Sequence, residues 1–242
     1  MRRFVDLHLR PSLGDLNHLE KMIGKSYELG YRLVGISLPP DIRQDKVELL
    51  KKICNDIGVD LVTRVDLTPK KPQELLRELR RLRRKFEVIS VMCDSKPVAR
   101  QAAKDRRVDL LSFPTDSRRR FFDQAEAELA SQALASLEIS MALLLSLRGE
   151  SRTRLFSRLR REAEIAERFN VPIVVSSGAT DEYLLRTPHD YAAFATLFDL
   201  AKPLGLRALS HNPLDIVKRN REKLSPNYVA LGVRIIKRGK NC

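Results

Sequence analysis

The chain has few of the residues that mark several common classes of protein. It contains no tryptophan and only 6% aromatic residues, so it offers no evident platform for stacking single-stranded bases. Its longest apolar stretch, from Ile139 to Leu147, is far shorter than the roughly 20 residues that span a bilayer. The first residues, MRRFVDLHLR, lack the apolar core of a secretory signal peptide. We therefore expect neither a membrane protein nor a secreted one.

Cysteine is also scarce. The three cysteines, Cys54, Cys93 and Cys242, are widely spaced and form neither a disulfide framework nor a CxxC zinc motif. This usage fits a reducing compartment. The sequence therefore predicts a cytoplasmic protein.

Acidic residues are outnumbered by basic ones. The 242 residues include 45 Lys and Arg against 31 Asp and Glu, which gives a formal net charge of +14. A surplus of this size concerns the partners of a protein rather than its fold. It favours binding of a polyanion.

The basic residues gather in four clusters along the chain. They are Arg77, Arg80, Arg81, Arg83, Arg84 and Lys85; Arg100, Lys104, Arg106, Arg107 and Arg118 to Arg120; Arg152, Arg154, Arg158, Arg160 and Arg161; and Lys218, Arg219, Arg221, Lys223, Arg234, Lys237, Arg238 and Lys240. Pairing with acids along the same helix explains part of the third cluster. It does not explain the fourth cluster or the triple arginine, because acids are scarce there. These clusters predict phosphate contacts with a double-helical RNA or DNA.

Short apolar runs alternate with helical patterns eight times, which predicts parallel strands joined by right-handed crossovers. The expected strands are Arg3–Leu7, Leu33–Leu38, Asp60–Val65, Val88–Met92, Val108–Ser112, Leu137–Met141, Ile173–Val175 and Leu206–Leu209. The expected helices are Leu16–Leu29, Lys46–Ile57, Pro72–Lys85, Pro97–Asp105, Asp123–Ala133, Arg152–Phe169, Pro188–Lys202 and Pro213–Leu224.

Eight such units predict an α/β fold, a TIM-like (β/α) barrel formed by one domain over residues 1–242. A basic extension covers about residues 225–242, and its run Tyr228–Ile236 is a candidate edge strand. An open doubly wound sheet is the alternative. That fold usually carries a G-x-G-x-x-G turn, which this sequence lacks.

Polar residues at the expected strand ends suggest two kinds of chemistry. Asp6 and His8 end the first strand, Asp66 follows the third, and His211 follows the eighth. If these side chains converged at the mouth of the barrel, the end where the strands finish, they would suit a metal ion. The alternative is that Asp6 and His8 satisfy backbone groups of the barrel. The start resembles that of PHP-type metallophosphoesterases, but Arg10 stands where their second histidine would be, so we expect no working metal site.

The turn after the seventh strand carries Ser176, Ser177 and Gly178. Many barrels bind phosphate at this position through backbone N–H groups. An ordinary strand-to-helix turn with a serine cap is an equally good interpretation.

Several segments together resemble one family. The segment from Val174 to Asp190 reads VVSSGATDEYLLRTPHD and is similar to the S-S-A…R-x-P-x-D segment of ribonuclease P protein component 3, the Rpp30 family of archaea and eukaryotes. Phe4–His8, Arg107–Ser112 and Leu137–Met141 resemble further family segments, in the same order along the chain. Gly178 within the serine segment and the long basic tail depart from the pattern.

The resemblance implies a PHP-like barrel without a catalytic site of its own, in an archaeal RNA-binding protein of tRNA processing. It implies a subunit that supports the catalytic ribonuclease P RNA, the endonuclease that removes the 5′ leader from precursor tRNA, with Mg²⁺ held by the RNA and no cofactor on the protein. The implied protein partner is a Pop5-type subunit. The RNA-binding residues implied by the family's positions are Arg100, Arg118, Arg119, Arg120 and Arg186.

Two other functions compete with this one. A PHP-like, metal-dependent phosphoesterase is disfavoured by Arg10 and by a total of four histidines. A DNA-binding protein is disfavoured because no helix-turn-helix or zinc-finger motif is present.

Overall fold

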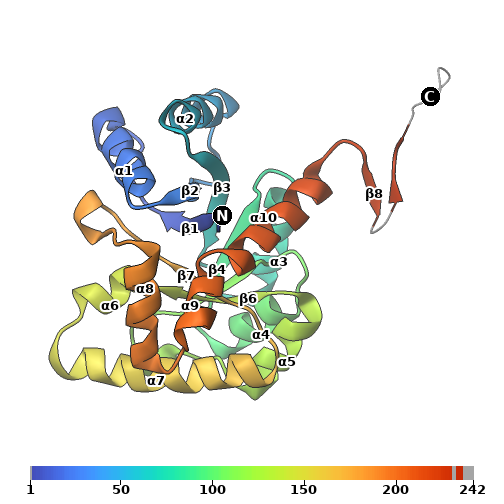
Figure 1. The fold of residues 1–242 in the computed structure, drawn as a ribbon. Coiled ribbons are helices and arrows are strands. Elements are labelled where there is room, and N and C mark those ends of the chain that lie inside the picture. The colour runs from blue at the N-terminus through green and yellow to red at the C-terminus, as the bar shows by residue number, and fades with distance from the viewer. Residues whose placement is uncertain (1, 231–232, 237–242) are drawn as a thin grey trace.

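The computed structural model describes residues 2–230 and 233–236, and its centre is a barrel of seven parallel strands (Figure 1). The strands are β1 (Phe4–Leu9), β2 (Tyr31–Ser37), β3 (Asp60–Leu67), β4 (Val88–Met92), β5 (Leu110–Ser112), β6 (Ser136–Ser140) and β7 (Ile173–Ser176). Each strand pairs with the next in the order β1 to β7. Strand β1 meets the end of β7 through a bridge between Leu9 and Ala179, and the Arg10 N–H donates to the Ala179 carbonyl at 2.8 Å. The predicted TIM-like barrel is confirmed.

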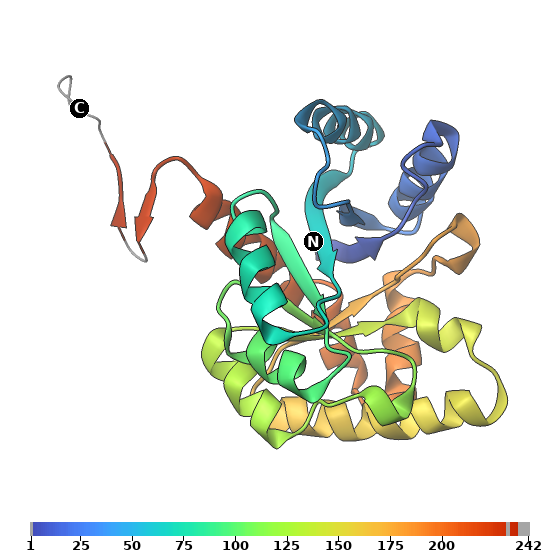
Figure 2. The same cartoon turned by 180° about the vertical axis from the view of Figure 1, so that it is seen from behind.

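Helices follow the strands and cover the outside of the barrel (Figures 1 and 2). They are α1 (Leu16–Glu28), α2 (Gln44–Ile57), α3 (Pro72–Leu82), α4 (Lys96–Lys104), α5 (Gln124–Ala133), α6 (Met141–Ser146), α7 (Gly149–Arg168), α8 (Pro188–Ala195), α9 (Lys202–Ala208) and α10 (His211–Leu224). Short 3₁₀ turns are η1 (Ser117–Arg119), η2 (Glu182–Leu184) and η3 (Thr196–Phe198). None of the helices in the described part of the chain is long and apolar enough to cross a membrane.

The eighth strand predicted at Leu206–Leu209 is wrong. Most of this segment lies in α9, and it is followed by α10, which packs against the N-terminal ends of the strands. Ile216 and Val217 of α10 are buried together with the apolar side chains that fill the lower interior of the barrel. The Val5 N–H donates to the Leu209 carbonyl at 2.9 Å, where a pairing strand would have accepted it. A helix that closes the base therefore replaces the last strand.

Polar contacts fix α10 to the starts of the strands. The Asn220 side-chain amide donates to the Glu87 carbonyl and to Asp109 Oδ1, each at 2.8 Å. Arg221 donates from Nη1 and Nη2 to the two carboxylate oxygens of Asp60, also at 2.8 Å. The fourth basic cluster thus obtains acidic partners from strands that lie far away in the sequence.

Two further predictions about the C-terminal third need correction. The helix expected over Pro188–Lys202 ends at Ala195, and the short turn after it closes at Asp199 with a left-handed φ of 63°. Strands β8 (Tyr228–Ala230) and β9 (Val233–Arg234) pair with each other and not with the barrel, so the run Tyr228–Ile236 is no edge strand of the main sheet. This hairpin stands away from the barrel (Figures 1 and 2). The predicted basic residues Lys237, Arg238 and Lys240, as well as Cys242, lie outside the described residues.

The interior of the barrel has an apolar lower half, near the N-terminal ends of the strands, and a polar upper half, near their C-terminal ends. The lower half is filled by Val5, Leu7, Leu33, Val62, Val88, Leu110 and Val174. Gly35 of β2 faces the β1 backbone so closely that a Cβ there would lie 2.5 Å from the Leu7 carbonyl oxygen. This close approach leaves the Leu7 carbonyl accessible to a polar side chain in the layer above.

Candidate functional site

An arginine occupies the centre of the polar layer at the mouth of the barrel. Arg64 of β3 is fully buried, and its guanidinium binds Glu138 of β6 through two hydrogen bonds of 2.5 and 2.7 Å. Its Nε donates to Asp66 at 2.8 Å, and Nη1 also donates to the Leu7 carbonyl at 3.1 Å. The paired geometry on Glu138 is the strongest form of an arginine–carboxylate contact. Every nitrogen of the guanidinium is therefore engaged inside the barrel.

Serines complete the hydrogen bonding of Glu138. Ser176 of β7 donates to Oε1 at 2.8 Å, and Ser90 of β4 donates to Oε2 at 3.3 Å. Ser112 of β5 also donates to Oε2. Burial raises the pKa of Glu138, but the charge and hydrogen bonds of Arg64 outweigh it and bring the pKa down to about 2. Glu138 is therefore a carboxylate at neutral pH, with its lone pairs satisfied within the fold.

His8 and Asp66 lie at the upper edge of this network. His8 Nε2 is 3.4 Å from Asp66 Oδ2, and His8 Nδ1 is 3.7 Å from Glu138 Oε1. Burial raises the pKa of Asp66, while Arg64 and then His8 lower it, with the net result well below its usual value. Ser37 donates to the same carboxylate. His8 thus stands beside two carboxylates that Arg64 already binds.

The Asp6 carboxylate accepts hydrogen bonds from backbone N–H groups and does not face the mouth cavity. Its Oδ1 accepts the N–H groups of His8 at 3.1 Å and Ser177 at 3.0 Å, which joins β1 to β7 at the seam of the barrel. Burial raises the pKa of Asp6, and the hydrogen bonds from Ser177 and His8 oppose that rise. His8 lines the mouth cavity, whereas Asp6 does not. The interpretation in which Asp6 satisfies backbone groups is therefore confirmed.

His211 does not join this site. It opens α10 at the base of the barrel, its side chain is 70% exposed, and its Nδ1 lies 2.9 Å from Asp215. The expected convergence with Asp6 and His8 is wrong because no eighth strand carries His211 to the mouth. Within residues 2–230 and 233–236, no three His, Cys, Asp or Glu residues form a group that suits a metal ion.

The residues at the mouth also do not fit a divalent cation chemically. A metal ion would need Glu138 and Asp66 as ligands, but the guanidinium of Arg64 already lies between these carboxylates. Binding of a second cation beside Arg64 would bring two positive charges together in a buried, weakly screened space. The guanidinium of Arg64 therefore already occupies the position between the two carboxylates that a metal ion would take.

A cavity of about 430 Å³ lies above the network, and the predicted phosphate turn borders it. Gly178 lines the cavity with a left-handed φ of 63°. Ser176 and Ser177 are fully buried and use their polar groups internally: the Ser176 hydroxyl donates to Glu138 and the Ser177 N–H to Asp6. The serines thus hold the turn in shape, and phosphate binding at this turn stays a prediction.

Three of the predicted RNA-binding arginines are exposed near the C-terminal ends of β4 and β5. Arg100 of α4 is 52% exposed and donates to Glu126 at 3.2 Å. Arg118 and Arg119 lie in the turn η1, where Arg119 contacts Asp94. Burial raises the pKa of Glu126 to about 7, helped by its hydrogen bond with Asp123, so its hold on Arg100 weakens as the solution becomes acidic. The structure therefore brings Arg100, Arg118 and Arg119 to one side of the barrel.

Arg120 and Arg186 are placed differently. Arg120 is 3% exposed, binds Glu162 of α7 with contacts of 2.6 and 2.9 Å, and also donates to the carbonyls of Phe113 and Pro114. Its guanidinium is consumed by the fold, so we omit it from the proposed RNA-binding set. Arg186 is exposed and donates to the carbonyls of Tyr183 and Leu185, both at 2.7 Å. Within the described residues it has no ion pair, and it does not line the mouth cavity.

No role was predicted for Arg64 and Glu138, although they organise the mouth. A usable pattern was present: each is a charged residue inside an otherwise apolar strand, LVTRVDL and SLEIS. Two opposite charges at such positions indicate a buried ion pair, because isolated buried charges are costly.

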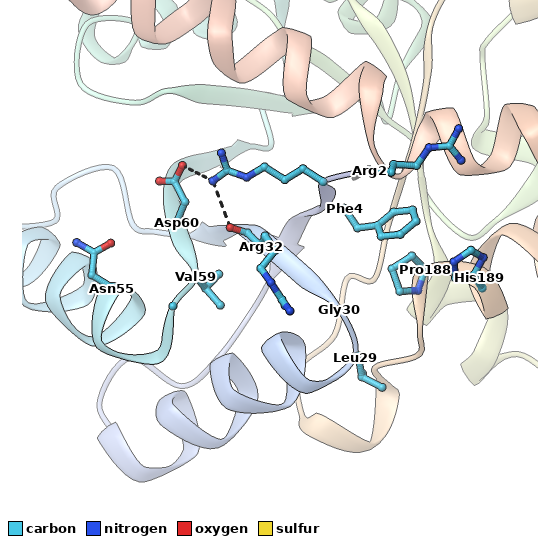
Figure 3. Close-up of a pocket in the computed structure, with 12 residues that line it drawn as sticks. Arg2, Phe4, Leu29, Gly30, Arg32, Asn55, Val59, Asp60, Pro188 and His189 are labelled. Carbon is cyan, nitrogen blue, oxygen red and sulfur yellow. Dashed lines mark hydrogen bonds and ion pairs between the residues drawn. The ribbon is translucent and has the colours of Figure 1, made fainter.

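A second hollow opens at the other end of the barrel and is drawn in Figure 3. Its volume is about 890 Å³, and it lies between the starts of β1 to β3 and the start of α8. The rings of Phe4 and His189 meet edge to face with centroids 5.4 Å apart. Arg3 binds Asp60 at 2.9 Å in the wall of the hollow. This hollow has no carboxylate network comparable to that of the mouth.

Comparison with known proteins gives consistent results. Residues 3–225 match the family described as RNase P subunit p30. Ribonuclease P protein component 3 of Methanosarcina mazei is 31% identical over 96% of this chain and 95% of that protein. A chain in the cryo-EM structure of archaeal ribonuclease P with mature tRNA has a TM-score of 0.85 at 23% identity, and the match covers 98% of this chain and all of that one. A chain from the crystal structures of YwqE from Bacillus subtilis and CpsB from Streptococcus pneumoniae, described as metal-dependent tyrosine phosphatases, is less similar, with a TM-score of 0.53 at 16% identity. The match covers 84% of this chain and 94% of that one. The chain therefore belongs to the RNase P subunit p30 family.

Proposed function

We propose that this chain is a protein subunit of ribonuclease P, which binds the catalytic RNA and supports removal of the 5′ leader from precursor tRNA. The observation that carries the proposal is the family match over residues 3–225, at nearly full length in the archaeal relatives. The buried ion pair of Arg64 and Glu138 agrees with it, because this pair fills the place where barrel enzymes hold their reactive groups.

Exposed arginines are proposed to contact the RNA. Arg118 has no ion pair within the described residues, and Arg100 is bound to a carboxyl whose pKa is near 7. Arg186 presents its guanidinium on the surface after η2. Their side chains are suited to phosphate oxygens, because a guanidinium forms two parallel hydrogen bonds with such groups.

Two further assignments belong to the proposal. A Pop5-type subunit is proposed as the protein partner, and Mg²⁺ is proposed to act on the RNA and not on this chain. A cytoplasmic location is proposed from the cysteine usage. The phosphoesterase alternative has less support, since Arg64 already binds the carboxylates that a metal would need.

The test uses the full chain with and without ribonuclease P RNA and the other protein subunits. The protein alone, with Mg²⁺ or Mn²⁺, should leave precursor tRNA uncut, and addition of the chain to the RNA-containing mixture should increase cleavage. Arg118→Ala and Arg186→Ala should weaken RNA binding while the melting temperature stays nearly unchanged. Cleavage by the isolated protein would contradict the proposal, and so would RNA binding that does not respond to salt.

A further inference from the structure

A basic groove lies at the base of the barrel, away from the mouth. It has a volume of about 590 Å³ and runs between α2, the segment that follows α3, and the end of α10. Lys51, Arg84 and Lys85 line it and are exposed. The acid in its wall, Glu87, is already bound: Oε1 accepts from Arg221 at 2.6 Å and Oε2 accepts from the Thr63 N–H at 2.8 Å. Glu87 is therefore already paired with Arg221 and is not an ion-pair partner of Lys51, Arg84 or Lys85.

The positive charge continues beyond the groove. Arg80 lies near the end of α3, four residues before Arg84 in the chain, Arg106 follows α4, and Lys223 is near the end of α10. All three are exposed. Burial lowers the pKa of Lys223, and the positive charges of Arg219, Arg83 and Arg106 contribute to the decrease. The Asp109 carboxylate, which binds Arg83 and Arg219, opposes this decrease, but the net shift of the Lys223 pKa is still downward.

Helix α7 shows that a basic helix in this protein need not be short of acids. Arg154 pairs with Glu150, Arg158 lies 3.4 Å from Glu162, and Arg160 lies 3.5 Å from Asp199. For the six residues at the base, the described part of the chain provides no ion pair. Solubility alone does not explain this difference, because the arginines of α7 and the six basal residues are exposed to the same solvent.

We propose that the basal patch, defined as Lys51, Arg80, Arg84, Lys85, Arg106 and Lys223, binds the phosphate backbone of helical RNA. This inference rests on the proposed function and adds a second contact surface, at the opposite end of the barrel from Arg118 and Arg119. The rim of the groove provides cations, while its Phe86 is 2% exposed and offers no ring for stacking. Such a surface suits backbone phosphates better than splayed bases. An acidic protein is the competing occupant that the experiment must separate.

The test compares two triple variants that each remove three positive charges. The basal variant is Arg80→Gln/Arg84→Gln/Lys85→Gln, and the matched control on α7 is Arg154→Gln/Arg160→Gln/Arg161→Gln. Binding of full-length variants to transcribed archaeal ribonuclease P RNA is measured from low to high salt. The basal variant should raise Kd about 10-fold and reduce the log–log salt slope by roughly 2 to 3, because three phosphate contacts are lost. The control should change Kd by less than about threefold.

The outcomes separate the two proposals. If both triple variants weaken binding equally, only net charge matters and the basal patch is refuted. If the basal variant binds the RNA normally while Arg118→Ala weakens binding, the patch is refuted and the proposed function stands. If the wild-type chain binds the RNA without salt dependence, the proposed function itself fails. Normal RNA binding combined with weaker assembly of the protein subunits would assign the patch to an acidic protein.

A footprint on the wild-type chain avoids any effect of substitutions on folding. Acetylation of Lys51, Lys85 and Lys223 is measured with and without the RNA, with the exposed Lys21 of α1 as the reference. The three basal lysines should be modified more slowly when the RNA is bound, while Lys21 should not change. Modification rates of the three basal lysines that do not change when the RNA is added would overturn the inference.

Discussion

The two ends of the barrel are both closed by arginine–carboxylate contacts, but they are built in different ways. At the mouth, the strands themselves provide the charges, and Arg64 is fully buried against Glu138 and Asp66. At the base, a helix from the end of the domain provides Arg221, which binds Asp60 while it remains 38% exposed. At the mouth a buried arginine is thus held by two carboxylates, whereas the base keeps further cations on its surface.

This difference indicates where the protein meets its partners. An enzyme of this fold keeps unsatisfied reactive groups at the mouth. Here Arg64, Glu138 and Asp66 bind one another, whereas the exposed cations of the basal patch have no acidic partner within the described residues. We infer that the mouth has a structural role and that the outer surface binds RNA.

The largest expected effect tests the mouth directly. Arg64→Met removes the partner of a fully buried carboxylate, and loss of one member of such a pair costs about 3–5 kcal/mol in the free energy of unfolding. Denaturation in urea measures this loss. Arg64→Met/Glu138→Gln removes both charges and should recover more than half of it. A single variant as stable as the wild type would show that the pair does not hold the mouth together.

A smaller loss is expected at the base. Asn220→Ala removes two hydrogen bonds from a residue that is 2% exposed and leaves the Asp109 carboxylate with fewer donors. The free energy of unfolding should fall by about 2 kcal/mol. Lys218→Ala, on the exposed side of α10, is the control and should change it little. If both substitutions cost the same, α10 is not anchored by these contacts.

The dependence of stability on pH should separate the two ends further. The pKa of Glu138 is lowered in the folded protein to about 2, so its stabilising contribution is complete above the unfolded pKa of 4.5 and is lost as the pH falls toward 2. Urea denaturation should show a decrease of about 1–2 kcal/mol between pH 5 and pH 3 that comes from this group. Arg64→Met/Glu138→Gln lacks the group and should lose less over the same interval. An identical decrease in both proteins would assign acid sensitivity to other carboxylates.

The sequence predicted the parts of the fold that depend on local patterns. Seven strands and most helices lie close to their expected positions, because apolar runs, Gly58 after α2 and Pro72 at the start of α3 act locally. The segment Leu206–Leu209 was misassigned because its apolar run is equally suited to a helix that packs behind the barrel. Only the closure of the base by α10 decides between the two, and that closure is a tertiary effect.

The site was harder to predict because its partners are distant in sequence. Arg120 was grouped with Arg118 and Arg119 by adjacency, yet its partner Glu162 lies on α7 and buries it. Arg64 meets Glu138 across the interior of the barrel, a pairing that one sequence does not reveal. Asp6 was recognised as a candidate, but the alternation of side chains along the strand did not show that its carboxylate accepts a hydrogen bond across the seam between β1 and β7.

The most direct test of this account measures precursor tRNA cleavage by ribonuclease P reconstituted with Arg64→Met/Glu138→Gln. The double variant abolishes the ion pair at the mouth and leaves Arg100, Arg118 and Arg186 intact. Circular dichroism and urea denaturation first establish that it is folded. The account predicts a cleavage rate within about twofold of that with the wild-type chain, because it assigns the ion pair at the mouth a structural role only. A folded double variant that lowers the rate more than about 10-fold would show that the mouth takes part in the reaction, which would contradict the account.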